Sequence, residues 1–381
     1  MKIIVAGDYC PQDRVLALID SGDYSFLKGT KSLLSGADYS IVNLECPVVV
    51  RDAKPIEKCG PNLCCGKKAI EALKEVGFSC VTLANNHFYD YGNEGVEQTL
   101  NACGEYEIDT VGGGVNLQKA SMVLYKEIEG KCIGIVNCCE HEFSIATEDS
   151  AGSNPLNPIQ QYYTIKEAKL KAGYVIVIVH GGSEHYQLPT PRMKELYRFF
   201  IDAGADAVIN HHQHCYTGYE VYKKKPIFYG IGNFCFDNPL KRNSIWTEGF
   251  LVQLDLDEEG VKFELFPYTQ CDKMVGVHMM DEAQKFKFNN SIEERNSIIQ
   301  DDKLLKAEFD KFSKIRRNDL LISVMPYKSR IMRYLAYKGF FPSFFGKDRA
   351  KLLFNYVNCE SHRDTFTLFL ENRYNTEDIK K

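Results

Sequence analysis

The chain has 381 residues, of which 44% are hydrophobic and 25% are charged, and its formal net charge is −5. This composition is typical of a globular protein with a sizeable core, long enough for one large domain or two modest ones. No apolar run reaches the roughly 20 residues that span a bilayer, and the opening "MKIIVAGDYCPQDR" is too interrupted for a signal peptide, so we expect a cytoplasmic protein.

The fourteen cysteines do not indicate a disulfide framework. Many lie inside apolar runs such as "GFSCVTLANN" and "GNFCFD", where Cys behaves as a small buried hydrophobe. Cys64-Cys65 and Cys138-Cys139 are adjacent pairs and lack the C-x-x-C spacing. We therefore predict reduced thiols and no structural zinc site of the usual spacing.

Along the chain, short β-branched runs alternate with helical patterns. Strands are predicted at 2–8, 39–45, 78–86, 131–139, 174–182, 205–212 and 226–234, and helices that end at Gly at 93–104 and 191–205. This alternation indicates an α/β protein. At 249–269 a period-two pattern surrounds an acidic turn with Gly and predicts an antiparallel hairpin, so we expect a mixed sheet system.

From about residue 283 the pattern becomes helical, which predicts a division into a domain at 1–282 and a helical basic extension at 283–381. Between Lys303 and Lys351 there are thirteen Lys/Arg and four Asp/Glu. This surplus is compatible with a solvated basic face, or with contact between 303–351 and a polyanion or an anionic membrane. No nucleic-acid-binding motif accompanies it, so we expect no nucleic-acid partner.

Metal-competent side chains stand at the carboxyl ends of five predicted strands. They are Asp8, Glu45, Asn86 with His87, His180, and His212 with His214. In α/β sheets this edge forms the ligand crevice, so these residues should converge. A single His at a strand end is commonly structural, but carboxylate, amide and imidazole groups at five ends predict a site for zinc, manganese or iron, with "NHHQHC" (210–215) as a ligand turn.

Six motifs, in this order and spacing, resemble the CapA family of bacterial proteins tied to poly-γ-glutamate and capsule synthesis: "AGD", "NLE", "LANNHFYDYG", "VHGGSE", "GADAVINHHQH" and "IFYGIGNFCFD". That family resembles the calcineurin-like metallophosphatases in fold. The resemblance covers about residues 1–240 and implies a metallophosphatase-like sandwich of mixed β-sheets flanked by helices. It does not extend to the last hundred residues.

The resemblance also implies one or two divalent ions (Mn, Zn or Fe) that hold a hydroxide for attack on a phosphoester or amide bond. Glu45 is implied as a ligand that bridges two ions, and His87 as a catalytic acid or electrostatic stabiliser. The remaining implied ligands are Asp8, Asn86, His180, and one or both of His212 and His214.

The chain departs from the phosphatase pattern at Cys10, which stands where those enzymes place a His two residues after the first Asp. One metal site therefore lacks an imidazole, and the thiol either replaces it or packs beside the site. Glu184 either orients His180, as a partner of a ligating His would, or contacts the substrate. Further candidates for the substrate-binding rim are Asn43, Asn85, His211, Asn233 and Cys10, and His211 is the least constrained histidine of the "NHHQHC" cluster.

Two functions remain open from the sequence. The first is a metal-dependent hydrolase or transferase that acts on a capsule, poly-γ-glutamate or cell-envelope polymer intermediate. The alternative is a non-catalytic metal-binding partner or scaffold of a capsule polymer synthase, which it would engage through the basic extension. Either function would be exercised from the cytoplasmic side, at the inner face of the membrane if 303–351 contacts it. An acid at His87 beside the ligands favours the first.

Overall fold

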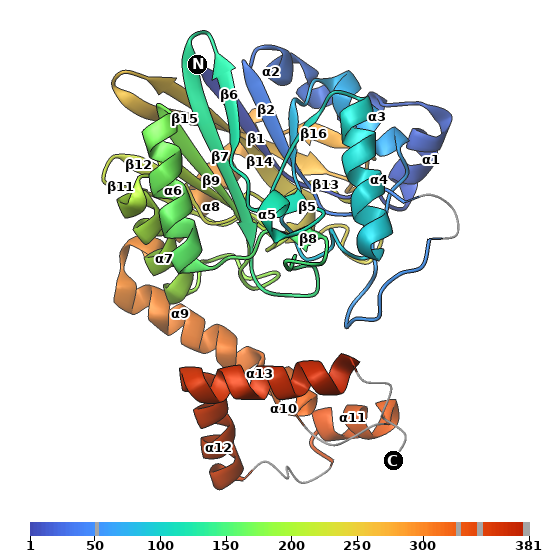
Figure 1. The fold of residues 1–381 in the computed structure, drawn as a ribbon, viewed down its shortest axis with the longest axis vertical. Helices are drawn as coiled ribbons and strands as arrows, with labels where there is room; N and C mark the ends of the chain where they lie inside the picture. The colour runs from blue at the N-terminus through green and yellow to red at the C-terminus, as the bar shows by residue number, and fades with distance from the viewer. Residues whose placement is uncertain (50–52, 325–328, 341–345, 376–381) are drawn as a thin grey trace. The chain divides into compact units, whose positions relative to one another are not determined.

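The computed structural model describes residues 1–49, 53–324, 329–340 and 346–375 (Figure 1). The chain divides into two compact units, Met1–Ala307 and Glu308–Lys381. The first unit holds two large β-sheets with helices packed on them, and the second is helical. The division predicted at residue 282 differs from this one because Phe288, Ile292 and Ile299 are buried in the first unit.

The first sheet has eight strands in the order β16-β15-β14-β1-β2-β3-β4, with β13 also paired to β1. The bounds are β1 Lys2–Tyr9, β2 Tyr39–Leu44, β3 Cys80–Thr82, β4 Asp109–Val111, β13 Asn233–Cys235, β14 Glu248–Asp257, β15 Gly260–Gln270 and β16 Val277–Met279. Strands β1 to β4 pair in parallel, whereas β14 pairs antiparallel with both β1 and β15. The predicted hairpin and the mixed character of the sheet are confirmed.

The second sheet has six strands in the order β11-β12-β10-β9-β7-β6. The bounds are β6 Leu124–Ile128, β7 Lys131–Cys139, β9 Tyr174–His180, β10 Ala207–His211, β11 Tyr219–Tyr222 and β12 Lys225–Phe228. Its four central strands, β7, β9, β10 and β12, run parallel. A short pair, β5 Gly113–Gly114 and β8 Gly152–Ser153, lies beside the large sheets.

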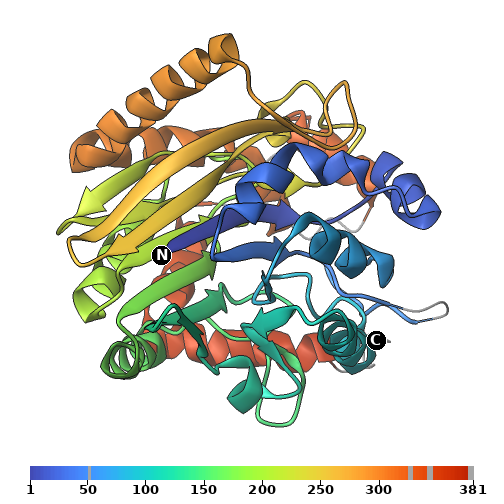
Figure 2. The same ribbon diagram turned by 90° about the horizontal axis from the view of Figure 1, so that it is seen from above.

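The two sheets face each other, and helices cover their outer faces (Figure 2). In β1, Ile3 and Val5 join the core between the sheets while Ile4 and Ala6 join the core under the helices, as the period of two requires. The helices of the first unit are α1 Arg14–Ser21, η1 Ser25–Thr30, α2 Lys31–Ser35, α3 Lys68–Val76, α4 Gly92–Glu105, α5 Leu117–Ala120, α6 Pro158–Lys171, α7 Pro191–Ala203, η2 Ile245–Thr247 and α8 Glu282–Gln300. The predicted fold class, mixed sheets flanked by helices, is confirmed.

Two predicted strands differ most from expectation. The strand predicted at 78–86 ends at Thr82. The residues that follow it, among them Asn85 and Asn86, lie in a turn at the edge of the sheet. The strand predicted at 226–234 is broken in two: β12 belongs to the second sheet and β13 to the first. The break lies at Gly232, whose φ of 80° favours glycine, and a Cβ on Gly7 would lie 1.8 Å from the carbonyl oxygen of Gly232.

The second unit consists of helices, as predicted for the C-terminal extension. Helix α9 Asp302–Ile315 leads into it, and α10 Arg317–Ser323, α11 Arg330–Tyr337, α12 Lys347–Asn358 and α13 Glu360–Asn375 follow. Residues 325–328, between α10 and α11, and 341–345, between α11 and α12, lie outside the described residues. Large apolar side chains of α11 and its neighbourhood are exposed, among them Ile331 (71%) and Phe340 (74%). Over the described residues, none of the helices combines the length and apolar character needed to cross a membrane.

Candidate metal centre

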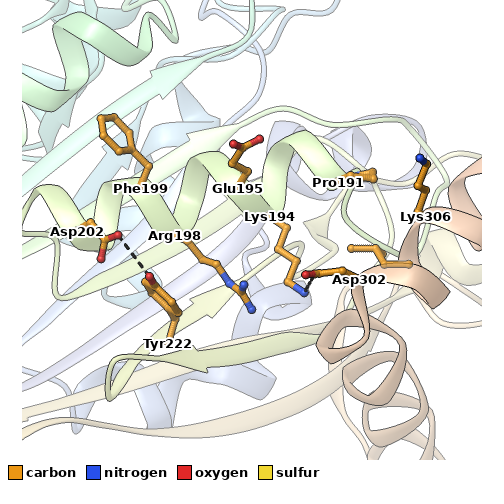
Figure 3. Close-up of a pocket in the computed structure, with 10 residues that line it drawn as sticks. Pro191, Lys194, Glu195, Arg198, Phe199, Asp202, Tyr222, Asp302 and Lys306 are labelled. Atoms are coloured by element: carbon orange, nitrogen blue, oxygen red, sulfur yellow. Dashed lines mark hydrogen bonds and ion pairs between the residues drawn. The ribbon is translucent and has the colours of Figure 1, made fainter.

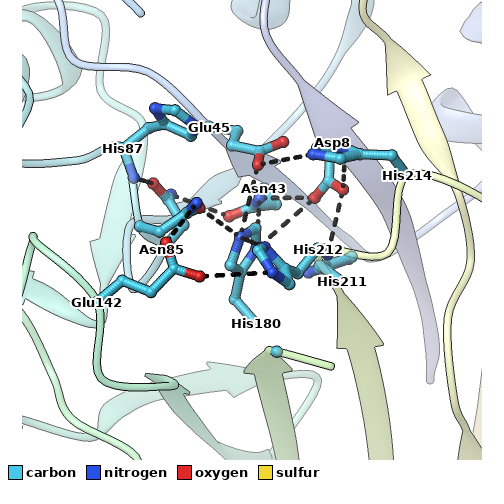
Figure 4. Close-up of polar contacts among 12 residues, drawn as sticks. Asp8, Asn43, Glu45, Asn85, His87, Glu142, His180, His211, His212 and His214 are labelled. Carbon is cyan, nitrogen blue, oxygen red and sulfur yellow. Dashed lines mark hydrogen bonds and ion pairs between the residues drawn. The ribbon is translucent and has the colours of Figure 1, made fainter. Parts of the chain in front are cut away.

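Five of the predicted ligands meet at the carboxyl edge of the two sheets (Figure 4). Asp8 lies near the end of β1, Glu45 directly follows β2, His180 ends β9, and His212 and His214 follow β10. All five residues are buried. Because β1 runs parallel to β2, and β9 to β10, the strands of each pair end at the same edge, and the four ends bring the side chains together.

The ligands form two groups that share Glu45: Glu45, His180 and His212 in one, and Asp8, Glu45 and His214 in the other. In the first, His180 Nε2 lies 3.5 Å from Glu45 Oε1 and 3.1 Å from His212 Nδ1. In the second, His214 lies 3.6 Å from Glu45 Oε1 through Nε2 and 3.6 Å from Asp8 Oδ2 through Nδ1. Two ligand atoms that each lie about 2.1 Å from one ion stand roughly 3.0–3.4 Å apart. The separations within the two groups, 3.1–3.6 Å, run from this range to slightly above it, so the residues of each group could hold an ion, and Glu45 belongs to both groups.

The surroundings of Glu45 show that a cation fits this place. The side chain is fully buried, and within the described structure neither of its carboxyl oxygens has a hydrogen-bond partner. Burial, followed by the charge of Asp8, raises the pKa of Glu45 well above its usual value. A buried carboxyl group without a partner is unfavourable by about 1–3 kcal/mol, and a bound cation supplies the missing interaction.

The charge states of the other ligands are also set by burial. Burial raises the pKa of Asp8 to about 7, against a hydrogen bond from Asn43 that lowers it. Burial and the neighbouring histidines lower the pKa of His180 and of His214 well below the usual value. Neutral imidazole is the form of histidine that binds metal ions, so both rings are held ready as ligands.

Asn86 adds an amide oxygen to the first group. Its Oδ1 lies 3.0 Å from His180 Nε2, and its Nδ2 donates to Glu142 Oε2 at 3.1 Å. Asn43 contacts two of the ligands: its Nδ2 donates to Asp8 Oδ1 at 2.7 Å and lies 3.3 Å from His180 Nδ1. The two groups are thus unequal. We call them the four-donor site (Glu45, Asn86, His180, His212) and the three-donor site (Asp8, Glu45, His214).

The "NHHQHC" turn holds its histidines in an unusual backbone conformation. His212 has a φ of 90° and His214 a φ of 53°, a region that costs a residue with a Cβ about 1–3 kcal/mol. Asn210 anchors the turn, because its Nδ2 donates to the carbonyl oxygens of Gly181 at 2.9 Å and of Tyr229 at 3.0 Å. The backbone N–H of His212 donates to Asp8 Oδ2 at 3.3 Å. The surrounding fold therefore fixes the turn in the conformation that presents both rings.

His87 stands between the ligands and an open pocket. The pocket has a volume of about 580 Å³, and its lining includes His87, His214, Glu184 and Trp246. His87 Nδ1 lies 2.7 Å from Asp90 Oδ2, so its other ring nitrogen, Nε2, is left for the pocket. The backbone N–H of His87 donates to Asn85 Oδ1 at 3.1 Å, which places Asn85 as a buried support rather than at the rim.

The remaining predicted residues lie around the ligands. Cys10 is buried in the apolar cluster under the helices and accepts from Gln12 Nε2 at 3.6 Å, so it packs beside the site and belongs to neither ligand group. The His211 ring is turned away, with Nε2 3.1 Å from the carbonyl oxygen of Ala6. Asn43 and Asn233 are buried rather than at the rim, and Asn233 Oδ1 lies 2.9 Å from His214 Nδ1.

Glu184 lines the open pocket beside the ligands. His180 Nδ1 lies 3.3 Å from Asn43 Nδ2, and His180 Nε2 lies 3.0 Å from Asn86 Oδ1. Of the two roles predicted for Glu184, its position fits contact with a substrate.

Sequence reasoning missed three residues of the site. Asp90 carried a signal, since it stands three residues after His87 within one turn. Glu142 carried a weaker one, because it closely follows β7 as the other polar residues follow their strands. Lys58 carried none: it comes from a long loop, and its ammonium group contacts Asp90 Oδ1 and lies 3.2 Å from His87 Nδ1.

A second pocket, of about 620 Å³, lies between α7, β11 and the start of α9 (Figure 3). Two of its basic side chains are paired: Lys194 Nζ lies 2.5 Å from Asp302 Oδ1, and Arg198 donates to both carboxyl oxygens of Glu220. None of the ligand residues named above lines it. The first pocket, by contrast, is lined by the ligand His214 and by His87.

Fold and site together define an α/β sandwich protein with a paired group of metal-competent ligands at the carboxyl edge of its sheets. Residues 2–238 match the family model described as "Bacterial capsule synthesis protein PGA_cap". This match spans more than half of the chain, so the chain belongs to that family. The resemblance to the CapA family predicted from the motifs is thereby confirmed.

Two similar proteins are also described as CapA biosynthesis proteins. The chain is 34% identical over 246 residues to the capsule biosynthesis protein CapA of Bacillus anthracis, covering 62% of this chain and 59% of that one. It is 32% identical over 252 residues to the PGA biosynthesis protein CapA of Bacillus subtilis (strain 168), covering 65% of each. The chain thus spans less than two thirds of the length of either relative.

Solved structures with a related arrangement include one described as a novel phosphatase from Mycoplasma pneumoniae. That structure has a TM-score of 0.46 and 18% identity, and the match covers 72% of this chain and 95% of that one. A 5′-nucleotidase precursor from Thermus thermophilus has a TM-score of 0.44 and 11% identity, over 79% of this chain and 59% of that one.

Proposed function

We propose that this protein is a metal-dependent hydrolase or transferase that acts on a phosphoester or amide bond of a capsule, poly-γ-glutamate or cell-envelope polymer intermediate. The observation that carries the proposal is Glu45, a fully buried carboxyl group whose two oxygens have no hydrogen-bond partner among the described residues and which belongs to both groups of histidine and carboxylate ligands. Membership of the capsule synthesis family supports the polymer assignment.

Divalent ions such as Mn, Zn or Fe at these two groups would supply Lewis-acid polarisation of a phosphoryl or acyl oxygen and activation of water. The chain itself supplies the ligands and a proton carrier. His87 is held through Nδ1 by Asp90, so Nε2 can give a proton to the leaving group in the pocket. Glu184, which lines the same pocket, contacts the substrate beyond the reacting atoms.

The test begins with metal content. Elemental analysis of the purified protein should find one or two equivalents of transition metal, reduced in Glu45→Ala and His212→Ala. Phosphoesters and γ-glutamyl amides are then screened with wild type and with His87→Ala, which should lose turnover but keep its metal. Absence of metal after reconstitution with zinc or manganese would overturn the hydrolase proposal. Full metal content without turnover on any substrate would favour the second candidate.

The second candidate is a non-catalytic metal-binding partner or scaffold of a capsule polymer synthase, engaged through the basic extension, whose residues 303–351 are also proposed to contact an anionic membrane surface. It is favoured by one observation: Ile331, Tyr334 and Phe340 are exposed in a stretch, 329–340, that carries Arg330, Arg333 and Lys338 and no acidic residue. Exposed aromatic and aliphatic side chains among cations are typical of interfacial helices.

This contact is tested by sedimentation with vesicles. We expect the full chain to bind phosphatidylglycerol vesicles more strongly than phosphatidylcholine vesicles, and the double variant Arg330→Glu with Arg333→Glu to lose the difference. Equal sedimentation with both lipids would overturn the membrane contact and leave a protein partner as the occupant.

A further inference from the structure

We propose that Glu142 is a positioning residue that orients two ligands, Asn86 and His212, and so sets the metal affinity of the four-donor site separately from that of the three-donor site. The inference rests on the proposed function, since it concerns how the same ligands are held. Glu142 lies on the connection between β7 and β8, and its side chain is 39% exposed.

Glu142 lies against the outward atoms of both ligands, and Figure 4 shows its contact with His212. Asn86 turns Oδ1 inward, 3.0 Å from His180 Nε2, and its outward Nδ2 donates to Glu142 Oε2 at 3.1 Å. His212 turns Nδ1 inward, 3.1 Å from the same His180 Nε2, and its outward Nε2 lies 3.7 Å from Glu142 Oε1. One carboxyl group therefore faces two side chains whose inward atoms converge on one point.

The chemistry of a carboxylate explains why this arrangement selects the ligand orientation. A carboxylate only accepts hydrogen bonds, so it favours the amide rotamer of Asn86 with the NH₂ group outward and the oxygen toward the ion. At 3.7 Å it also attracts, more weakly, a proton on Nε2 of His212, and the tautomer with that proton leaves the lone pair of Nδ1 for the ion. The Asn86 contact is the tighter of the two, since the 3.7 Å between Glu142 and His212 exceeds hydrogen-bond length.

The three-donor site has supports of its own. His214 Nδ1 lies 2.9 Å from Asn233 Oδ1, and Asp8 Oδ1 accepts from Asn43 Nδ2 at 2.7 Å. The contacts that Glu142 makes are to Asn86 and His212, which both belong to the four-donor site. Loss of the Glu142 carboxylate should therefore weaken one site and spare the other, which a general loss of negative charge would not do.

The experiment is a titration of the metal-free full-length protein with Co²⁺, followed by calorimetry and by visible absorption, which reports the coordination of each bound ion. We expect Glu142→Gln and Glu142→Ala to weaken one of two binding steps about 10–100-fold and to change the absorption of that step. His214→Ala should weaken the other step. The matched control is Glu148→Gln, the same change of charge at an exposed residue of the same connection, which should leave both steps unchanged.

Each outcome decides the inference. Unchanged steps in both Glu142 variants would overturn it, and so would an equal weakening of both steps, which would mark a purely electrostatic effect. Retention of wild-type affinity and absorption by Glu142→Asp, whose shorter side chain cannot reach both ligands, would also overturn it. If the wild-type protein binds no Co²⁺, the proposed function fails first and this inference falls with it.

Discussion

Replacement of Glu45 by methionine should change stability in opposite directions with and without metal. In the metal-free protein, Glu45→Met exchanges a buried carboxyl group with two unpartnered oxygens for an apolar group of similar length. Removing that unpaired group should raise the free energy of unfolding by about 1–3 kcal/mol. For domains of about 150–250 residues such a gain corresponds to a rise in Tm of roughly 2–12 °C.

The wild type should regain the advantage when metal is added. A ligand at about 100 times its Kd stabilises the folded state by about 2.7 kcal/mol, and Glu45→Met, which lacks a ligand common to both sites, should gain none of it. Thermal unfolding in chelator and in excess Mn²⁺ measures both values, with Glu105→Met at an exposed position as the control. A variant that is less stable than wild type in chelator, yet stabilised equally by Mn²⁺, would refute the assignment of Glu45.

The pH dependence of the same difference has a definite sign. Burial raises the pKa of Glu45 in the folded protein above its usual 4.5, so the proton binds the folded state more tightly than the unfolded state. The stability that this proton gives the folded wild type is therefore fully present below pH 4.5. That contribution is lost as the pH rises toward the raised pKa. The advantage of Glu45→Met over the metal-free wild type should therefore grow as the pH rises from about 5. An advantage that shrinks over this range would contradict the burial of an unpaired carboxyl group.

Three further predictions follow from buried contacts. Lys58→Met should lower the free energy of unfolding by about 3–5 kcal/mol in urea titrations, because it leaves Asp90 without its buried cation. The control variant Lys67→Met, at a surface ion pair, should change the free energy of unfolding by less than about 1 kcal/mol. Similar losses in both variants would contradict this prediction. Gly7→Ala should prevent stable folding, seen as loss of a cooperative unfolding transition, because its Cβ would lie 1.8 Å from the carbonyl oxygen of Gly232; a wild-type midpoint would refute the close approach. Since the pKa of Asp8 is raised to about 7, metal affinity should increase from about pH 6 to about pH 8 with release of protons, and a flat calorimetric profile would count against Asp8 as a ligand.

The sequence predicted the central strands of both sheets because those strands carry a local signal, whereas β4, β6, β11 and β16 were not predicted. Runs such as 131–139 and 174–182 are rich in β-branched residues and became β7 and β9 with bounds close to those predicted. The run at 226–234 misled for a physical reason: it is apolar along most of its length, and the break that sends its halves to different sheets depends on a backbone contact with β1. No local pattern in the sequence records that contact.

The site was predictable to the extent that it lies at strand ends. Asp8, Glu45, His180, His212 and His214 end or follow buried strands, so topology alone carries them to one edge. Supporting residues are not under that constraint. Lys58 reaches the site from a loop and Glu142 from another, and such contacts depend on loop conformations that residue type and spacing do not determine.

The conformation of the "NHHQHC" turn affects which variants directed evolution for thermal stability would select. His212 and His214 occupy backbone conformations that glycine adopts without strain, so glycine there relieves strain in the metal-free chain while it deletes a ligand. A library sorted only for thermal stability in chelator should therefore accumulate variants without these histidines. Sorting the same library with metal present should retain them, because the bound ion then outweighs the strain. The selective environment, rather than the fold, decides whether this turn remains a pair of ligands.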